Sequence, residues 1–444
     1  MSVFQQVSAF LGRNKFPVGG LEINSLIDSI LYDMEKGLDI GYGEGPMDAR
    51  QPMIPTWGLP PKKTPQNTSV IVIDAGGTNF RSCLVSFDES GVPTISHLEK
   101  CSMPGIEREL SKDEFFDAIA ENLEHLKNLS DRIGFCFSYE INITPDGDGE
   151  VISFSKEIKA KSVVGSLVGK SLSEALVKKG WKKPERIVLL NDTTAALQAG
   201  AASKRLGAKY SSYVGFILGT GMNAAYIESE KIKKVAKFVS DALPEQIVVC
   251  ESGAFDKLPR SDFDVTLDNE TTNPGQHSIE KMCSGAYLGP LSLLVSRAAA
   301  SEGLFSSNIA EKLLSLEKIS LYDVDQFLYG PYRTDTVIGS VLEGGSAEDY
   351  DTMYFLLDAI IERSARLSAS IIAACVIKSG EGHSPVQPVC ILCNGTTFYK
   401  THGLQDRVRS YLLKHLTEER HIYFEIVSVE NDITLGTAIA ALSN

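Results

Sequence analysis

Residues 70–81 read V-I-V-I-D-A-G-G-T-N-F-R, and this stretch decides the fold. Its first four residues are β-branched and apolar without polar alternation, so they predict a strand buried on both faces. Gly76 and Gly77 permit a tight turn, which can present backbone N–H groups to anionic oxygens. Asp74, at the mouth of the strand, suits a metal ion held through water. The stretch indicates a nucleotide phosphate with its magnesium; the alternative is an ordinary β-hairpin with a Gly-Gly turn.

Length and composition limit the class of protein. The chain has 444 residues, which predicts two domains or more. A hydrophobic content of 43% and a charged content of 23% are typical of a soluble globular protein. The net charge of −14 argues against general nucleic-acid binding, which needs a basic face. It does not forbid a nucleotide, because a glycine loop and a magnesium ion can carry the phosphate charge.

Targeting signals are not evident. Residues 1–15 lack the long apolar segment of a signal peptide. No apolar run approaches the roughly eighteen residues of a membrane span. We therefore expect a cytoplasmic protein that does not bind membranes.

The cysteines and histidines do not predict a metal or a catalytic triad. Most of the eight cysteines lie inside apolar runs, where free cysteine is common. Cys390 and Cys393 form a C-x-x-C without the second pair that a zinc site needs, so V-C-I-L-C-N reads as a strand. No H-E-x-x-H pattern occurs, and no Ser-His-Asp arrangement follows from spacing.

Strands and helices alternate along the chain, which predicts an α/β fold. Apolar residues at helical spacing mark the first fifty residues, and the polar, proline-rich residues 58–67 read as a connector to the first strand. We expect strands over 81–87 and 94–103, a helix over 112–126 and a strand over 132–137.

A second hairpin echoes the first. Residues 213–226 read Y-V-G-F-I-L-G-T-G-M-N-A-A-Y, again an apolar strand, a Gly/Thr turn with an asparagine, and a second apolar strand. Two such hairpins facing each other could hold one polyphosphate from both sides, which suggests two domains closing on a shared cleft. The alternative is a coincidence between two buried hairpins.

Polar residues follow another predicted strand. Residues 187–194 read I-V-L-L-N-D-T-T, which places Asn191 and Asp192 at the carboxyl end, where ligands bind in open α/β sheets. Asp192 could accept a proton from a hydroxyl nucleophile as a general base. It could equally be the N-cap of the helix that follows.

Further polar residues would suit a polyhydroxylated ligand, because a sugar needs many directional polar contacts. Glu251 follows the apolar run 247–250, whereas Glu280 could be a solvated helix residue. Ser155 and Lys156 lie in F-S-K-E-I-K-A-K, which could be only a basic surface. Each signal is weak when taken separately.

In order and spacing, however, these segments resemble the hexokinase family within the actin-like ATPase superfamily. The match runs from about residue 53 to the C-terminus. It comprises M-I-P-T at 53–56, D-A-G-G-T-N-F-R at 74–81, G-F-C-F-S at 134–138, F-S-K-E-I-K-A at 154–160, N-D-T at 191–193, G-T-G-M-N at 219–223, E-S-G-A-F at 251–255, N-P-G-Q-H-S-I-E-K-M at 273–282 and N-G-T-T-F-Y at 394–399.

The resemblance implies a two-domain actin-like ATPase (ribonuclease H-like) α/β fold with a cleft between a small and a large domain. The small domain is expected to hold residues 68–190 and 433–444, and the large domain residues 1–67 and 191–432. The implied reaction transfers the γ-phosphoryl group of Mg-ATP to the 6-hydroxyl of a hexose that enters glycolysis. Glucose is the expected sugar, with mannose and fructose as further candidates. We expect a monomer, with a homodimer as the alternative.

The resemblance also assigns roles to matching residues. Asp192 would be the catalytic base, assisted by Lys156, and Asp74 would hold Mg²⁺ through water. The sugar contacts would be Ser155, Lys156, Asn191, Asp192, Asn223, Glu251 and Glu280. The ATP contacts would be Asp74, Gly76, Gly77, Thr78, Asn79, Arg81, Gly219, Thr220, Gly221, Gly395 and Thr396, the last two near the adenosine.

The chain departs from the family pattern near the expected sugar site. Ser155 replaces the usual threonine, Ser252 a tryptophan, and His277 a glutamine that often contacts sugar. Tyr139 and Glu140 replace Phe-Pro, and the segment N-D-I-T-L-G-T-A at 431–438 lacks the Gly-Ser-Gly run. These changes concern sugar preference and nucleotide affinity and remove no residue that the chemistry needs.

Two other functions remain as alternatives. A sugar-responsive binding protein would bind sugar without consuming ATP. A chaperone-like or cytoskeletal ATPase would share the two phosphate hairpins but have no use for Asn191, Glu251 and Glu280, and its ATPase activity would not depend on glucose.

Overall fold

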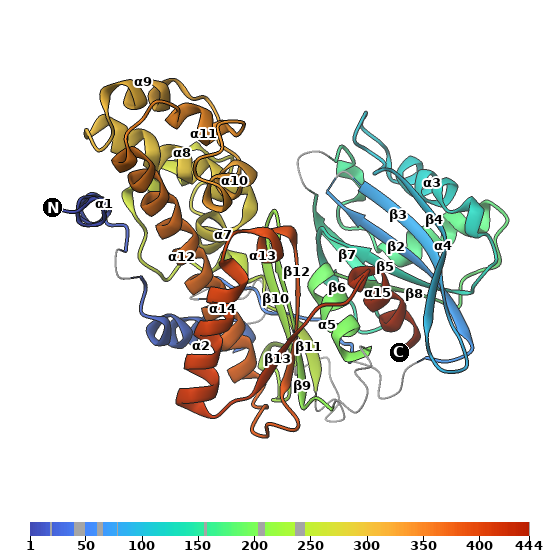
Figure 1. Ribbon diagram of the computed structural model, residues 1–444. Coiled ribbons are helices and arrows are strands. Elements are labelled where there is room, and N and C mark those ends of the chain that lie inside the picture. The colour runs from blue at the N-terminus through green and yellow to red at the C-terminus, as the bar shows by residue number, and fades with distance from the viewer. Residues whose placement is uncertain are drawn as a thin grey trace.

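The chain forms two layers of β-sheet with helices between and around them (Figure 1). The computed structural model describes residues 1–17, 20–39, 49–59, 65–77, 79–154, 158–202, 209–235 and 245–443. Part of the predicted connector, residues 60–64, therefore lies outside the described residues. Within the described ranges, no helix combines the length and the apolar character needed to cross a bilayer.

The first sheet has five strands in the order β4-β3-β2-β5-β8. Strands β2, β3 and β4 form an antiparallel meander, and β5 and β8 continue the sheet in parallel with β2. The predicted first hairpin is confirmed, with Gly76 opposite Asn79 across its turn. The strands are β2 (Thr68–Gly76), β3 (Asn79–Phe87), β4 (Pro93–Ser102), β5 (Arg132–Phe137) and β8 (Arg186–Leu190).

Both faces of β2 are buried, as its apolar run predicts. Ile71 and Ile73 lie in the core that includes Phe115 of α3 (Lys112–Asn122) and Leu172 of α4 (Val168–Lys178). Val70 and Val72 lie in a separate core on the other face, with residues of α15 (Asp432–Ser443). The helix expected over 112–126 is shorter than predicted, because its last three residues form a separate 3₁₀ turn (Glu124–Leu126).

The second sheet has six strands in the order β1-β11-β10-β9-β12-β13. The predicted second hairpin is β9 and β10, which pair with Leu218 opposite Met222. The C-x-x-C is confirmed as part of a strand, since Cys390 and Cys393 are both buried free thiols on β12. The strands are β1 (Ile54–Pro55), β9 (Ser212–Leu218), β10 (Met222–Glu228), β11 (Gln246–Val249), β12 (Val389–Asn394) and β13 (Phe424–Val427).

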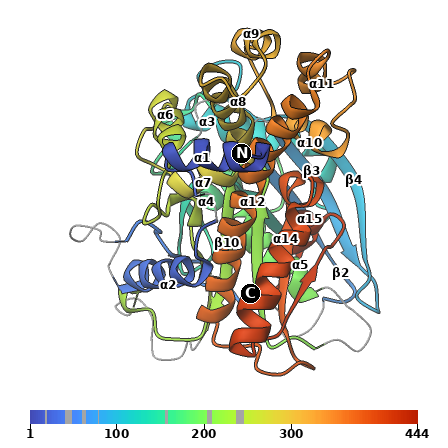
Figure 2. The ribbon, with the colours of Figure 1, turned by 60° about the vertical axis from the view of Figure 1, so that its left-hand side comes forward.

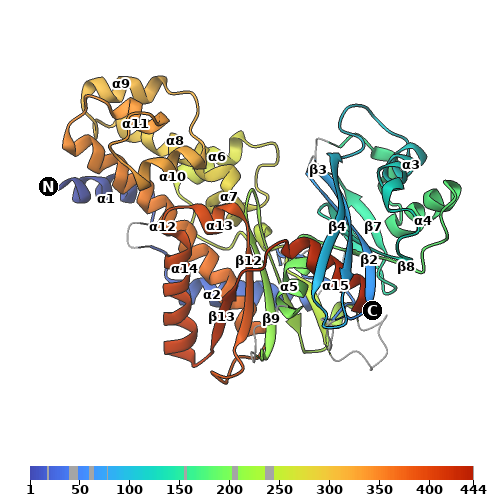
Figure 3. The ribbon, with the colours of Figure 1, turned by 45° about the vertical axis from the view of Figure 1, so that its right-hand side comes forward.

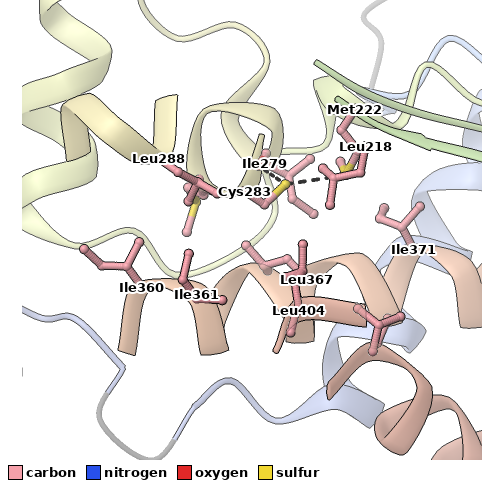
Figure 4. Close-up of a cluster of buried hydrophobic side chains, with 14 of the residues drawn as sticks. Leu218, Met222, Ile279, Cys283, Leu288, Ile360, Ile361, Leu367, Ile371 and Leu404 are labelled. Atoms are coloured by element: carbon pink, nitrogen blue, oxygen red, sulfur yellow. Dashed lines mark hydrogen bonds between the residues drawn. The ribbon is translucent and has the colours of Figure 1, made fainter. Parts of the chain in front are cut away.

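A long helix, α12 (Ala347–Lys378), packs against β9 and β10 and organises the largest core. Helices α2 (Ile23–Asp39) and α14 (Leu404–Leu412) lie alongside it (Figure 2). The core anchors the β9–β10 turn, because Leu218 and Met222, on either side of the turn, are both buried in it (Figure 4). The thiol of Cys283 reinforces this packing, with its Sγ 3.5 Å from the Met222 Sδ.

Two helices, α5 (Asp192–Ala202) and α15, pack against each other between the sheets (Figure 3). Their close approach requires glycine at position 436, because a Cβ there would lie 1.7 Å from the Ala195 carbonyl oxygen. Helix α5 begins directly after β8. This arrangement places the first residues of both helices, Asp192 and Asp432, between the two sheets.

The remaining helices and strands complete the two lobes. A small sheet of β6 and β7 extends from the end of β5, and Trp57, just after β1, donates its indole N–H to the Ile143 carbonyl of β6 (2.9 Å). These elements are α1 (Val3–Arg13), β6 (Glu140–Ile143), β7 (Gly149–Ser153), α6 (Asp262–Glu270), α7 (Ser278–Cys283), α8 (Gly285–Ser301), α9 (Ser307–Ser315), α10 (Leu321–Tyr329), α11 (Val337–Leu342) and α13 (Thr396–Lys400), with 3₁₀ turns at Lys161–Val163, Lys233–Val235 and Ser252–Ala254 and a π-helical segment at Leu413–Glu418 that follows α14.

Candidate active site

A cleft of about 800 Å³ opens between β6–β7 and the second sheet. Five of the predicted sugar contacts line it together, although they come from distant parts of the sequence: Asn191, Asp192, Asn223, Glu251 and Glu280. Ser155 and Lys156 lie outside the described residues, between Phe154, which lines the cleft, and Ile158.

Asn191 caps helix α5, and Asp192 occupies its first turn. The Oδ1 of Asn191 accepts the Thr194 N–H (3.1 Å), which is the hydrogen bond that an N-cap residue makes. Asp192 is therefore not the N-cap of α5, which was the alternative interpretation of this residue. Its carboxylate accepts the N–H of the adjacent Thr193 (2.8 Å), and it lines the cleft.

The electrostatic surroundings of Asp192 suit a proton acceptor. Burial is the main cause that raises its pKa to about 6; the negative charges of Asp74 and Asp432 act in the same direction, and the Thr193 N–H opposes the shift. A carboxylate with a pKa near 6 is still ionised at pH 7, yet it is more basic than a solvated aspartate. This is the property that a general base requires.

Asn223 and Glu251 lie side by side in the wall of the cleft. The Nδ2 of Asn223 on β10 donates to Oε1 of Glu251 (2.8 Å), which lies two residues beyond the end of β11. Glu251 has a left-handed backbone, with φ of 54°. Burial raises its pKa to about 7, the Asn223 hydrogen bond lowers it, and the charges of Asp192, Glu140 and Glu280 raise it. The cleft thus concentrates negative charge and hydrogen-bond acceptors.

Glu280 is not a solvated helix residue. Its Oε2 accepts the Met222 N–H (2.9 Å), and a Cβ on Gly221 would approach that oxygen to 2.7 Å. The carboxylate therefore joins helix α7 to the β9–β10 turn at the cleft wall. His277, which immediately precedes α7, has a φ of 53° and also lines the cleft.

The first hairpin presents Asp74 and the two glycines at one edge. Asp74 lies opposite Arg81 in the register of β2 and β3, with 3.9 Å between Oδ2 and the guanidinium. Burial raises the pKa of Asp74, the Arg81 charge lowers it and the Asp432 charge raises it. Gly77 has a φ of 56°, a conformation that favours glycine. Thr78 lies outside the described residues.

The second hairpin turn, residues 219–221, is held by the segments behind it. The Gly219 carbonyl accepts both the Gly285 N–H (2.8 Å) and the Thr397 hydroxyl (2.9 Å), and the Thr220 carbonyl accepts the Ala286 N–H (3.1 Å). Thr220 and Gly221 line the cleft. The turn is therefore a fixed platform that borders both the cleft and α8.

Gly395 lies against this turn. Its φ is 116°, and a Cβ at this position would meet the Leu218 carbonyl oxygen at 2.1 Å. Thr396 and Thr220 share a second cavity of about 360 Å³ with residues of α8 and α10. The residues predicted to lie near the adenosine are thus found beside the turn of the second hairpin.

Sequence reasoning missed several residues of the site. Asp432 faces Asp74 and Asp192 closely enough to raise the pKa of both, and it accepts two hydrogen bonds from the Asn394 amide (2.8 and 2.6 Å). The sequence does contain a signal for Asp432, because N-D-I-T at 431–434 resembles N-D-T-T at 191–194. Tyr322, Asp325 and Lys400, which line the second cavity, carry no comparable signal.

The donor set fits a hydrated Mg²⁺ that is bound together with phosphates. Mg²⁺ in nucleotide sites keeps several waters and uses one or two carboxylates plus the phosphate oxygens. Among the described residues, no group of three or more His, Cys, Asp or Glu side chains forms a cage that would hold an ion by itself. Asp74 is a half-buried carboxylate whose ion pair with Arg81 is long, at 3.9 Å, so a metal with its waters would supply compensating charge.

Comparison with known proteins agrees with this geometry. Two family models, both described as hexokinase, match residues 13–202 and 213–443. The chain belongs to the hexokinase family. It is, by that membership, an enzyme that phosphorylates a sugar, and the predicted resemblance is confirmed.

Curated relatives align over most of the chain. Hexokinase-1 of Schizosaccharomyces pombe is 27% identical over 94% of this chain and 87% of its own length. Hexokinase-2 of Saccharomyces cerevisiae is 26% identical, covering 92% and 85%, and glucokinase-1 of Kluyveromyces lactis is 26% identical, covering 90% of each.

The fold is that of solved hexokinases. The structure of the Schistosoma mansoni hexokinase complexed with glucose superposes with a TM-score of 0.79, at 23% identity, over 100% of this chain and 99% of that one. A second hexokinase structure gives the same TM-score and covers 99% and 98%. The expected two-domain actin-like ATPase fold is confirmed.

Proposed function

We propose that this chain transfers the γ-phosphoryl group of Mg-ATP to the 6-hydroxyl of glucose, with mannose and fructose as further substrates. The observation that carries the proposal is the state of Asp192. It lines the cleft, Asn191 makes the helix-capping bond in its place, and burial raises its pKa to about 6. A second carboxylate, Glu251, lies in the same cleft with an amide donor beside it.

Asp192 would act as the general base. Its carboxylate accepts the proton of the sugar 6-hydroxyl as the oxygen attacks the γ-phosphorus and the bond to the ADP oxygen breaks. Asn191, Asn223, Glu251 and Glu280 would hold the other hydroxyls, and Ser155 and Lys156 would complete the contacts. Fixing the sugar in this way converts the reaction into an effectively unimolecular step.

The two hairpins would hold the nucleotide. Gly76, Gly77, Thr78, Asn79 and Arg81 would face the phosphates from one side, and Gly219, Thr220 and Gly221 from the other. Thr396 would border the adenosine in the 360 Å³ cavity, and Gly395, the residue before it, would lie near the adenosine against the β9–β10 turn. Asp74 would hold the magnesium ion through water, and the ion would neutralise developing charge on the phosphates.

The two-lobed arrangement supports the proposed domains. Residues 68–190 supply the five-stranded sheet, and α15 packs on it from 432 onward, so we propose the small domain as 68–190 with 433–444. Residues 1–67 and 191–432 would form the large domain. Closure of the domains would exclude water, which competes with the sugar as acceptor. We propose a cytoplasmic, monomeric enzyme at the entry to glycolysis.

The test is ADP release from Mg-ATP in parallel wells with glucose, mannose, fructose, galactose, N-acetylglucosamine or no sugar. We expect release with glucose, none without sugar, and none with Asp192→Ala. ADP release that does not depend on sugar would instead indicate a chaperone-like or cytoskeletal ATPase of the same superfamily. Glucose binding without release would replace it with a sugar sensor.

A further inference from the structure

Tyr139 contacts both halves of the site. Its side chain lines the cleft and is 8% exposed. Its hydroxyl donates a 2.7 Å hydrogen bond to the carbonyl oxygen of Gly77 in the turn of the first hairpin. One side chain therefore joins the wall of the sugar cleft to the turn that faces the phosphates in the proposed function.

The strand arrangement brings Tyr139 to this turn. Strand β5 runs parallel to β2 with Phe137 opposite Ala75, and the Ser138 N–H donates to the Ala75 carbonyl (2.9 Å). A Cβ on Gly76 would lie 3.1 Å from the Ser138 side chain. The chain therefore leaves β5 in contact with the hairpin, and the hydroxyl of the next residue reaches its turn.

The ring of Tyr139 packs in the other direction. Its centroid lies 4.8 Å from that of Phe137 and 5.2 Å from that of Phe154. Phe154 immediately precedes Ser155 and Lys156, the expected sugar contacts outside the described residues, and it lines the cleft itself. The ring thus supports the residue from which the sugar-binding segment starts.

We propose that Tyr139 is a positioning residue that couples the sugar cleft to the phosphate hairpin. A glycine at positive φ has wide conformational freedom, so a hydrogen bond to the Gly77 carbonyl restricts the direction in which the neighbouring N–H groups face. The inference rests on the proposed function.

Tyr139→Phe tests the hydroxyl alone, because the ring and the wall remain. We expect the KM for ATP to rise about two- to tenfold, the range for one lost buried hydrogen bond, with the KM for glucose unchanged. ADP affinity in the presence of magnesium and glucose, measured by calorimetry, should fall by the same factor. Glucose affinity without nucleotide should stay at the wild-type value.

Tyr210→Phe is the matched control. Its hydroxyl donates to Glu425 Oε2 (2.8 Å) near the start of β9, at the opposite end of that strand from Leu218 and the cleft. Both KM values should remain those of the wild type in this variant, so a general effect of losing a tyrosine hydroxyl is separated from the effect at the site.

Two results would overturn the inference. If Tyr139→Phe kept the KM for ATP and the ADP affinity of the wild type, the hydroxyl would not position the hairpin. An equal loss of affinity for ADP and glucose with a lowered Tm would assign it to folding alone. If the wild-type protein phosphorylated no sugar, the proposed function would fail instead, and ADP binding would still test the contact with the hairpin.

Discussion

The side-chain amide of Asn223, on β10, donates a 2.8 Å hydrogen bond to Oε1 of Glu251, two residues beyond the end of the neighbouring β11. Its orientation is set by the main chain, because its Oδ1 accepts the N–H groups of Ala224 (2.7 Å) and Ser252 (3.3 Å). The Nδ2 atom is thereby directed at Glu251. The pair forms a fixed part of the cleft wall rather than two independently mobile side chains.

Glu251→Gln should weaken sugar binding and stabilise the fold at neutral pH. Burial raises the pKa of Glu251 to about 7, from 4.5 in the unfolded chain, so the folded protein binds more protons between these values and loses stability as pH rises through that window. Glutamine keeps an acceptor for Asn223 and removes the charge. At pH 8 the variant should gain up to about 3 kcal/mol, since the two pKa values, about 7 and 4.5, differ by roughly 2.5 units and one unit corresponds to about 1.4 kcal/mol.

Urea unfolding at pH 5 and pH 8 checks this prediction, with the gain present at pH 8 and nearly absent at pH 5. The KM for glucose should rise about tenfold, as for the loss of a charge-assisted hydrogen bond. Glu89→Gln, at an exposed position, should change neither quantity. A variant less stable than the wild type at pH 8 would contradict the argument.

The raised pKa of Asp192 predicts that activity falls at acidic pH. In the proposed function Asp192 accepts the 6-hydroxyl proton, and protonation below a pKa of about 6 would remove that acceptor, so kcat should fall about tenfold per pH unit below that value. Asp192→Asn should lower kcat by a factor on the order of 10² to 10⁴ while glucose binding, followed by calorimetry, stays within a few-fold. A profile that stays flat from pH 7 to pH 4.5 would remove Asp192 from the role of base.

The hairpins and the ends of the strands could be predicted from the sequence because their signals are local. The unbroken apolar run at 70–73 predicted a strand buried on both faces, and β2 shows this. The run before Asn191 likewise placed Asn191 and Asp192 at the carboxyl end of β8. The sequence could not decide whether Asp192 is the N-cap of α5. Asn and Asp are both favoured N-caps, and the answer depends on a one-residue shift in the start of the helix.

Contacts between distant segments could not be predicted in this way. The approach of Asp432 to Asp74, and of the Tyr139 hydroxyl to Gly77, depends on how helices and strands pack in space. Lys234 lies in K-I-K-K-V, which reads as a charged surface, yet it is buried beneath the cleft-lining segment at 52–54. Lysine is so seldom fully buried that composition could not predict one whose ammonium lies among backbone carbonyl oxygens.

Gly395→Ala should weaken nucleotide binding selectively. The residue has a φ of 116° and ψ of 142°, a region open essentially only to glycine, and its Cβ would lie 2.1 Å from the Leu218 carbonyl oxygen. The clash would push α13 away from the β9–β10 turn. Backbone strain of this kind costs on the order of 1–3 kcal/mol, so the KM for ATP should rise at least tenfold. Glucose affinity without nucleotide should remain that of the wild type.

Gly380→Ala is the control for backbone strain without a clash. Gly380 has a φ of 69°, a Cβ added there would meet no atom within 4 Å, and the residue lies just beyond the end of α12, away from the second cavity. Its substitution should lower the free energy of unfolding by about 1 kcal/mol and leave the KM for ATP unchanged. Equal effects of the two substitutions on that KM would contradict the proposed place of the adenosine.

Lys234→Met should destabilise the protein strongly. The buried ammonium donates to the carbonyl oxygens of Gly37 (2.9 Å), Pro52 (2.6 Å) and Met53, and it ties the end of α2 to the segment that enters the cleft. Methionine fills a similar volume but leaves these acceptors without their donor. The free energy of unfolding should fall by at least about 2 kcal/mol, and the KM for glucose should rise because Pro52 lines the cleft.

The pH dependence distinguishes this mechanism from a simple packing defect. Burial lowers the pKa of Lys234 to about 8, from 10.5 in the unfolded chain, so between these values the unfolded chain binds more protons and the wild type gains stability as pH rises. Its advantage over Lys234→Met should therefore widen from pH 8 to pH 10. Lys233→Met, whose side chain is 70% exposed beside Asp39, should change stability by less than about 0.5 kcal/mol, and an equal loss in both variants would show that the buried donor is not the cause.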